Sequence, residues 1–313
     1  MKQRKVSIVV PLFNEKESLG ELVDAVTRAF RGYVFECVFV DDGSTDGSFQ
    51  KLVALRKKMN FQATLVRLRR RSGKSAALSE GFRHITGDVV VTLDADLQDD
   101  PFEATKLIKK LDEGFDLVVG WRRKRRDSGG KLGVSHLFNW GVAMASGVRL
   151  HDMNSGLKAM KSDVAKEIHL YGELHRFVPV LAYARGFKVG ETPIVHHPRK
   201  YGTSKFGFER IFAAFDLLTT LFLAGFGTRP LMIFGPPGVL LIATGTFAIG
   251  YLSVLHFMGQ SIGTRPLLLF GVLFVLFGLQ LLSTGLLGEL ITSISTNQRR
   301  SPVSEIITYE YNH

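Results

Sequence analysis

Cysteine is nearly absent from this chain of 313 residues, which contains Cys37 alone. A single cysteine excludes an internal disulfide, and its position in an apolar stretch predicts a buried thiol. The chain also lacks internal repeats and low-complexity segments, which excludes a solenoid-like organisation.

Charged residues are missing from two long stretches near the C-terminus, residues 231–264 and 266–288. Each stretch exceeds the roughly 20 apolar residues that cross a bilayer core. This favours two membrane-spanning helices, at about 231–258 and 266–290, over two very long helices in a soluble core. Because the link between the stretches is short, we expect a hairpin.

Positive charge is concentrated before the hairpin. The three basic and three acidic residues after Pro230 cancel, so the formal net charge of +11 lies in residues 1–229. No nucleic-acid-binding module accompanies this charge, and anionic lipids or phosphorylated substrates are the expected partners. Only Arg265 lies in the connection of the hairpin, whereas its outer flanks contain Arg199, Lys200, Lys205, Arg210, Arg229, Arg299 and Arg300. The positive-inside rule therefore predicts both termini in the cytosol.

The first 120 residues alternate between strand and helix patterns, which predicts an α/β fold with a doubly wound, mostly parallel sheet. The expected strands are Val6–Pro11, Phe35–Val40, Ala63–Leu68, Val89–Leu93 and Leu117–Val119. The expected helices are Ser18–Phe30, Gly47–Lys58, Ser75–Ile85 and Phe102–Asp112. Further on we expect helices at Leu132–Ala145 and Glu173–Ala184 and strands near Ser155–Met160 and Lys188–Ile194.

Four parts follow from this organisation. Residues 1–205 are expected to form a cytosolic α/β domain. Residues 206–228 are expected to form a juxtamembrane amphipathic segment at the membrane surface, with a core-facing helix as the alternative. Residues 229–292 contain the two membrane helices, and residues 293–313 form a cytosolic tail.

The most informative motif stands where a β-branched apolar run stops at Asp94-Ala95-Asp96. These carboxylates would lie at the carboxyl end of a buried strand, where open α/β sheets bind ligands. Mg²⁺ prefers such oxygen ligands and completes its shell with water and substrate phosphates. We therefore expect Asp94 and Asp96 to bind a divalent cation. Asp99 and Asp100 need only cap the helix that follows.

Two more polar clusters follow strands at the same edge of the sheet. Pro11–Glu15 follows the first strand and Asp41–Ser44 follows the second. An acid after the second strand can accept hydrogen bonds from a ribose or a base, although Asp-Asp-Gly-Ser is also an ordinary turn. Together the three clusters are placed to contact one nucleotide and a metal.

Two other patterns are not expected to be sites. Gly73–Ser75 resembles the end of a P-loop, but Leu68 replaces the glycine that this motif requires five residues earlier. His196 and His197 lack the partner set of a zinc site.

These motifs give the chain a resemblance to glycosyltransferase family 2 enzymes of the dolichol-phosphate mannosyltransferase type. It looks most like the bacterial polyprenyl-phosphate glycosyltransferases with two C-terminal membrane helices. The motifs that carry the resemblance are Pro11–Glu15, Val40–Ser44, Asp94–Gln98 and Arg199–Lys205. The resemblance implies a GT-A fold, a bacterial inner-membrane location, and inverting transfer of a hexose from a UDP- or GDP-sugar to undecaprenyl or dolichyl phosphate at the cytosolic leaflet.

The resemblance also implies roles for individual residues. The nucleotide sugar would be held by Pro11, Phe13, Glu15, Asp41 and Ala95, with Asp42 in support. Mg²⁺ or Mn²⁺ and the donor diphosphate would meet Asp94, Asp96 and Gln98, of which the two aspartates are the catalytic residues. Phosphates would be clamped by Arg122, Arg199 and Lys205, and the acceptor phosphate by Lys131, Ser135 and Ser204. Phe13 departs from the tyrosine common at its position.

Two alternatives remain at this stage. An enzyme that glycosylates a hydroxyl group, on a glycolipid or a polysaccharide, would need a general base, for which Glu173 and His175 are the candidates. The Gln-x-x-Arg-Trp motif of processive synthases is absent. A catalytically silent membrane scaffold of the same fold is the other alternative. Each of these functions is compatible with a homo-oligomer.

Overall fold

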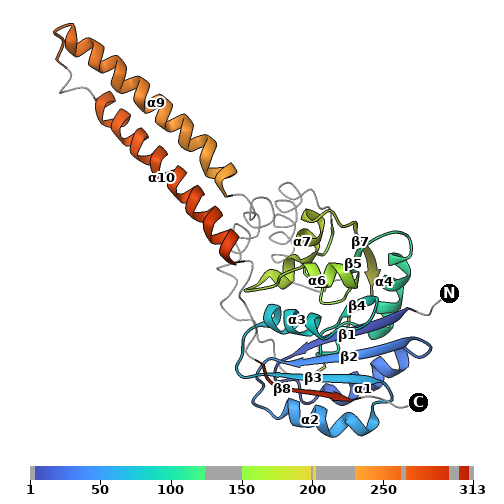
Figure 1. Ribbon diagram of the computed structural model, residues 1–313. Coiled ribbons are helices and arrows are strands. Elements are labelled where there is room, and N and C mark those ends of the chain that lie inside the picture. The colour runs from blue at the N-terminus through green and yellow to red at the C-terminus, as the bar shows by residue number, and fades with distance from the viewer. Residues whose placement is uncertain are drawn as a thin grey trace. The chain divides into compact units, whose positions relative to one another are not determined.

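The computed structural model describes residues 4–123, 150–198, 200–201, 230–261, 266–295 and 303–309 (Figure 1). The chain divides into two compact units: residues 1–221 together with 300–313, and residues 222–299. Several predictions fall outside the described residues: the helix at Leu132–Ala145, the segment 206–228, and the site residues Lys131, Ser135, Arg199, Ser204 and Lys205.

A mixed eight-stranded sheet forms the centre of the larger unit in the described part of the chain, in the order β7-β5-β6-β4-β1-β2-β3-β8. The strands are β1 (Lys5–Leu12), β2 (Val34–Asp41), β3 (Gln62–Leu68), β4 (Val89–Thr92), β5 (Leu117–Arg122), β6 (Lys158–Lys161), β7 (Val189–Ile194) and β8 (Val303–Tyr309). Strands β1 to β4 pair in parallel, as does β5 with β7, whereas β6 and β8 run antiparallel to their neighbours. The predicted α/β fold with a mostly parallel sheet is confirmed.

Helices connect the strands and cover the sheet (Figure 1). They are α1 (Leu19–Ala29), α2 (Ser48–Leu55), α3 (Lys74–Arg83), α4 (Ala104–Leu111), α6 (Ser162–Glu167) and α7 (Val178–Ala184), with 3₁₀ turns at Arg56–Lys58, Pro101–Glu103 and Leu174–Phe177. Asp100 caps the second of these turns, since its side chain accepts a hydrogen bond from the Phe102 amide at 2.9 Å. Its predicted capping role is confirmed.

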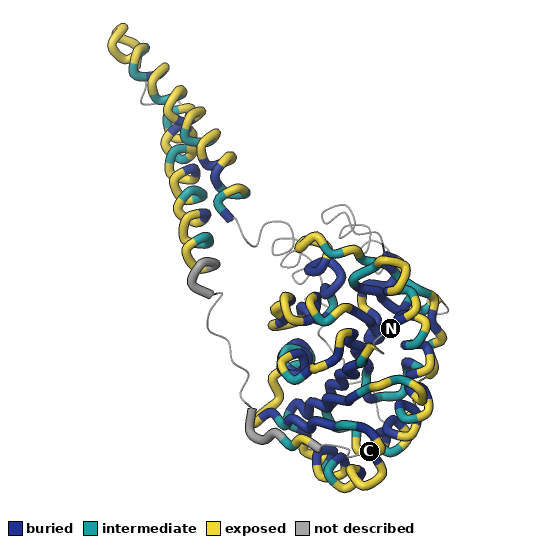
Figure 2. Tube along the Cα trace, turned by 45° about the vertical axis from the view of Figure 1, so that its right-hand side comes forward, coloured by how far each residue is buried: buried dark blue, intermediate teal, exposed yellow. Residues whose placement is uncertain are grey.

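The core lies between the central strands and the helices. Consecutive residues Ile8, Val9 and Val10 of β1 are all buried, which is the pattern of a parallel strand covered on both faces. Leu22 and Val26 of α1 are fully buried at helical spacing. Figure 2 shows this buried interior in dark blue.

A buried carboxylate ties the amino ends of β1, β2 and β4 together. Glu36 is 3% exposed and accepts hydrogen bonds from Ser7 Oγ, from the Thr86 amide and from Thr86 Oγ1 at 2.6, 2.6 and 2.7 Å. Lys5 Nζ lies 2.8 Å away. Burial favours a higher pKa for Glu36, but these donors outweigh it and lower the pKa below its ordinary value.

The smaller unit contains two long apolar helices, α9 (Leu231–Phe257) and α10 (Pro266–Ser295). Both are long and apolar enough to cross a membrane, and most of their length is exposed in Figure 2. They pack through glycines, because a Cβ on Gly278 would lie 2.6 Å from the carbonyl oxygen of Gly238, and one on Gly245 equally close to that of Gly271. This close approach of small residues is typical of membrane helix pairs. The two predicted helices are confirmed.

The last strand was not expected. Residues 293–313 were predicted only as a tail, whereas β8 pairs antiparallel with β3, from Ala63 opposite Tyr309 to Leu68 opposite Val303. Ile307 packs against the core of the larger unit. The chain therefore leaves this unit, forms the two apolar helices, and returns to complete the sheet.

Candidate active site

A cavity opens at the carboxyl ends of β1, β2 and β4, where the three predicted clusters lie. Among the predicted residues, its walls contain Pro11, Phe13, Glu15, Asp42, Asp94, Ala95 and Asp96. The walls also contain Leu12, Arg71, Gly73, Lys74, Ala77, Glu173 and His175. The predicted convergence of strand ends on one site is thus present in the structure.

Asp94 lies directly beyond β4 and is held by Lys74, whose Nζ is 2.5 Å from Asp94 Oδ1. On its other side is Gly156, where a Cβ would come within 2.4 Å of Asp94 Oδ2. Burial favours a higher pKa for Asp94, but the positive charges of Lys74 and Lys158 outweigh it and lower the pKa. Asp94 is therefore ionised at neutral pH.

Asp96 stands on the turn that follows, and its Oδ1 accepts a hydrogen bond from the Gln98 amide at 3.2 Å. Between them Leu97 has a φ of 60°, in the left-handed region that non-glycine residues rarely adopt. Gln98 does not line the cavity, and its backbone carbonyl accepts a hydrogen bond from the His197 amide at 2.7 Å.

The two carboxylates fit a hard divalent cation. In the described part of the chain, no group of three or more His, Cys, Asp or Glu side chains is arranged to hold a metal. The protein would thus offer Asp94 and Asp96, and the remaining ligands would come from water and from phosphates of the substrate. This donor set is typical of Mg²⁺ sites that form together with a phosphorylated ligand.

The two acids at the end of β2, Asp41 and Asp42, lie differently, because successive residues of an extended chain point to opposite sides. Asp42 lines the cavity and accepts hydrogen bonds from the amides of Ser72 and Gly73 at 2.6 and 2.9 Å. Asp41 is fully buried and is not among the lining residues; its Oδ1 accepts from the Ser44 amide at 3.0 Å. Burial raises the pKa of both carboxyls. A ligand in the cavity can meet Asp42 directly, with Asp41 behind it.

Phe13 and Arg71 form a planar surface on the cavity wall. The Arg71 guanidinium carbon lies 4.7 Å from the centroid of the Phe13 ring. The Phe13 loop is fixed by its neighbour Asn14, whose amide donates to Ser44 Oγ at 2.8 Å and whose Oδ1 accepts from the Thr45 amide at 2.9 Å. A flat aromatic or charged group is well placed to bind there.

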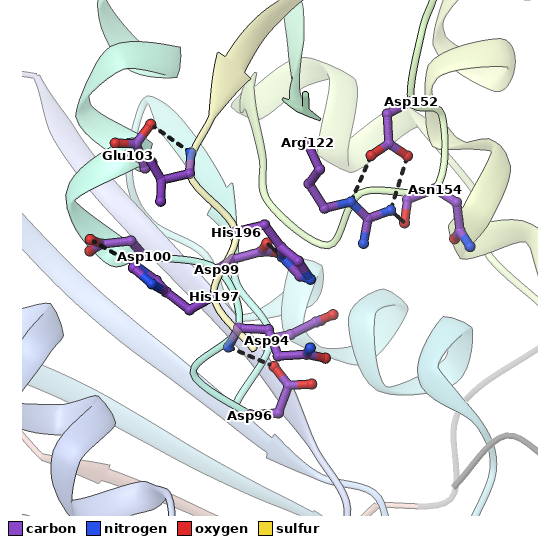
Figure 3. Close-up of polar contacts among 12 residues, drawn as sticks. Asp94, Asp96, Asp99, Asp100, Glu103, Arg122, Asp152, Asn154, His196 and His197 are labelled. Atoms are coloured by element: carbon purple, nitrogen blue, oxygen red, sulfur yellow. Dashed lines mark hydrogen bonds and ion pairs between the residues drawn. The ribbon is translucent and has the colours of Figure 1, made fainter. Parts of the chain in front are cut away.

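Arg122 lies outside the lining of the cavity. Its Nε and Nη2 donate to the two oxygens of Asp152 at 2.6 and 2.9 Å, and Nη2 also donates to the Asn154 carbonyl at 3.2 Å (Figure 3). This bidentate pair fixes the side chain at the end of β5. The structure therefore brings Arg122 into a carboxylate contact, and its expected phosphate contact remains a prediction.

The sequence did not predict Lys74 as a residue of the site and named His175 only as a candidate base for a hydroxyl acceptor. Lys74 was set aside as part of a false P-loop, although its place at the start of a helix after β3 points it toward the same sheet edge. His175 comes from a distant part of the chain; its Nδ1 lies 3.1 Å from Ser75 Oγ, and its backbone amide donates to the same oxygen at 2.9 Å. Burial and nearby Lys74 lower its pKa to about 2, so His175 is neutral.

Lys158 is a second missed cation. It is buried, it donates to the Ser155 carbonyl oxygen, and burial together with the charge of Lys74 lowers its pKa to about 7. Nothing in the sequence around Lys158 marks it as different from a surface lysine. The result is a site in which two aspartates lie among lysines, beside a planar wall, which suits a phosphorylated ligand bound with a cation.

Comparison with known proteins agrees with this geometry. A family model described as "Glycosyl transferase family 2" matches residues 7–168. A dodecaprenyl-phosphate galacturonate synthase of Rhizobium johnstonii is 36% identical over 309 residues, which cover 95% of this chain and 90% of that protein.

The fold is also found in solved structures. Glucosyl-3-phosphoglycerate synthase from Mycobacterium tuberculosis, in complex with Mn²⁺, UDP-glucose and phosphoglyceric acid, has a TM-score of 0.56 at 20% identity over 71% of this chain and 79% of that chain. The same values hold for its complex with Mg²⁺ and UDP. At this identity the likeness shows the GT-A fold alone.

Proposed function

Because this chain belongs to glycosyl transferase family 2, we propose that it transfers a hexose-type sugar from a nucleotide sugar to a polyprenyl phosphate. The similarity to the dodecaprenyl-phosphate galacturonate synthase carries the proposal, since it covers 95% of the chain and so includes both apolar helices. The donor would be UDP- or GDP-linked, and an oxidised hexose such as galacturonate belongs among the sugars to be tested.

The cavity offers a place for each part of the donor. The base and ribose would lie against Phe13 and Arg71, with Glu15 and Asp42 as hydrogen-bond acceptors. The diphosphate would then extend toward Asp94 and Asp96. A divalent cation held by these two carboxylates would neutralise the diphosphate and make it a better leaving group.

The transfer itself needs little from the protein beyond position and charge. A non-bridging oxygen of the acceptor phosphate would attack the anomeric carbon from the face opposite the diphosphate. The bond from that carbon to the diphosphate oxygen breaks, the electron pair leaves with the nucleoside diphosphate, and the anomeric configuration inverts. Lys74, held 2.5 Å from Asp94, places positive charge where the leaving group becomes negative.

No side chain has to remove a proton in this reaction, because a phosphate monoester is largely a dianion at neutral pH. The low pKa of His175 supports a reaction without a general base. With a pKa near 2, its imidazole is a weak acceptor for a hydroxyl proton. Glu173 is instead paired with Arg176 at 3.0 Å.

The sheet supports a particular arrangement of the chain in the membrane. Since β8 pairs with β3, residues on both sides of the apolar helices belong to one folded unit and must occupy one compartment. The two helices would therefore cross the membrane as a pair. We place this unit on the cytosolic side of a bacterial inner membrane, because the basic residues lie on the outer flanks of the hairpin and only Arg265 lies in its connection.

The proposal is tested with membranes that contain the protein, undecaprenyl phosphate and a panel of labelled UDP- and GDP-sugars, including UDP-galacturonate. We expect one donor to give a labelled lipid with release of its nucleoside diphosphate, and no product with unphosphorylated undecaprenol. Equal transfer to undecaprenol would contradict the proposal and favour a hydroxyl acceptor.

A further inference from the structure

A short segment after β7, residues Val195–Pro198, crosses the loop that carries the site aspartates. We name residues Asp94–Asp100 the acidic loop and Val195–Pro198 the crossing segment. The two are joined by an isolated antiparallel bridge between Asp99 and His196 and by the His197 amide, which donates to the Gln98 carbonyl at 2.7 Å. The acidic loop is therefore restrained from β7 as well as from its own strand β4.

Side chains reinforce this crossing (Figure 3). His196 Nδ1 lies 2.8 Å from Asp99 Oδ1, and the Val195 amide donates to Glu103 Oε2 at 3.3 Å. The Asp99 side chain is 3% exposed and that of His196 is 22% exposed, so this contact is largely shielded from water. In contrast, His197 is about half exposed and lies 3.7 Å from Asp100.

The loop needs such restraint. Leu97 has a φ of 60°, which is unfavourable for a leucine and persists only where the surroundings enforce it. Asp96 and Gln98 flank this residue, and their hydrogen bond closes the turn on the cavity side. On the other side the turn is held where Gln98 and Asp99 meet the crossing segment.

We propose that His196 is a positioning residue for the reaction: through Asp99 it fixes the turn that presents Asp96 to the cation and the donor diphosphate. The proposal rests on the proposed function, because that function gives Asp96 its ligand. His196 itself does not line the cavity, so it would act only through the loop. Residues that orient metal ligands in this way typically change metal affinity by about 10- to 100-fold when they are removed.

The test uses the full-length protein in detergent. It measures the binding of UDP or GDP, whichever the active donor contains, while Mn²⁺ is titrated. His196→Ala should raise the Mn²⁺ concentration for half-maximal binding by about 10-fold or more. His196→Asn should keep it within about 3-fold of wild type, because its amide can replace the Nδ1–H donor. His197→Ala is the matched control and should leave it unchanged.

A second measurement separates positioning from general support of the fold. Asp99→Ala removes the acceptor and should raise the Mn²⁺ requirement as His196→Ala does, and the two changes together should cost little more than either alone. The KM for the lipid acceptor should stay within about 2-fold while kcat falls. If His196→Ala does not fold, the Asp99→Ala variant provides the same comparison.

Three outcomes would overturn the inference: an unchanged Mn²⁺ requirement in both variants, a lower melting temperature with no change in that requirement, or wild-type nucleotide binding that does not depend on Mn²⁺. The proposed function can fail separately. If the wild type binds UDP or GDP with Mn²⁺ and the His196 variants change the Mn²⁺ requirement as expected, but no polyprenyl phosphate is glycosylated, the proposed function is wrong while His196 still positions Asp96.

Discussion

At the scale of single residues, the site depends on how Asp94 is held. Lys74 neutralises its carboxylate on one side, and Gly156 leaves room for it on the other. A cation that binds Asp94 must therefore compete with an ammonium group already in place. Under the proposed function the gain would come from the diphosphate that arrives with the cation, which would link metal binding to donor binding.

Asp96→Asn should lower turnover by about 100-fold or more, the scale of losing one electrostatic contact to the transition state. The fold should be retained, because Asp96 lies on a loop outside the core. Asp24→Asn, on the exposed face of α1, is the control. Full activity of Asp96→Asn, or of the wild type in excess EDTA, would exclude a metal role.

Gly156→Ala tests the space around Asp94. The added Cβ would lie 2.4 Å from Asp94 Oδ2, so the carboxylate must move. We expect a loss of turnover of about 100-fold, as small displacements of catalytic groups produce. Gly20→Ala is the control, since its Cβ would meet nothing within 4 Å. Unaltered kinetics of Gly156→Ala would show that Asp94 need not occupy its present position.

The nucleophile can be tested through pH. If the acceptor is a phosphate dianion, the acceptor-dependent rate should fall only below about pH 6, where the phosphate monoester gains a proton. Glu173→Gln and His175→Ala should each retain most of the turnover, because neither side chain has to remove a proton. Loss of transfer in either variant with intact donor binding would instead indicate a general base and a hydroxyl acceptor.

At the scale of secondary-structure elements, local patterns predicted most of the fold. The apolar run of β1 and the helical spacing in α1 were sufficient to place both. Helix α6 was missed because it has only six residues. Strand β8 was missed because its partner β3 lies more than 200 residues earlier, and no local pattern reports such a pairing.

The residues of the site divide in the same way, into those that a local sequence pattern marks and those that tertiary packing brings in. Asp94 and Asp96 were predicted because strand ends in an α/β sheet converge on one edge. Lys158 was not predicted, because it reaches the region only through tertiary packing, which sequence spacing does not contain. The choice between Asp41 and Asp42 also depended on side-chain direction, which the structure alone provides.

The Glu36 cluster predicts how stability depends on pH. The pKa of Glu36 is lower in the folded protein than its ordinary value of 4.5. Its contribution is therefore present above about pH 4.5 and is lost as the pH falls through the lower folded pKa. Glu36→Gln should be less stable at pH 7 by about 1–3 kcal/mol and should show a smaller loss between pH 5 and pH 3.

Melting temperatures of both proteins across this pH range provide the measurement. Glu17→Gln, which changes an exposed glutamate, is the control. Parallel curves of melting temperature against pH for the wild type and Glu36→Gln would show that Glu36 does not cause the loss of stability at low pH.

At the scale of the whole molecule, the chain leaves its catalytic unit and returns to it. A truncation after Ser204 would remove both apolar helices and also β8. The sharper change replaces residues 222–299 with a flexible linker and keeps β8. This variant should bind nucleotide as the wild type does, but transfer poorly to long-chain polyprenyl phosphate.

We expect this loss of transfer because the two apolar helices would concentrate the catalytic unit at the lipid surface, where the acceptor resides. A short, water-soluble prenyl phosphate is the control and should be used equally by both proteins. Equal rates with the long-chain acceptor in the same detergent would show that the helices take no part in its capture.

The late position of β8 also has a consequence for how the protein is made. During translation, β1 to β7 emerge before the apolar helices, and β3 then has an open edge until the last residues of the sheet leave the ribosome. An unpaired edge strand is a site for wrong association between chains. Slow or failed membrane insertion would prolong this exposure, so nascent copies would depend on chaperones at that stage, and faulty insertion would be detectable as an incomplete sheet in the cytosol.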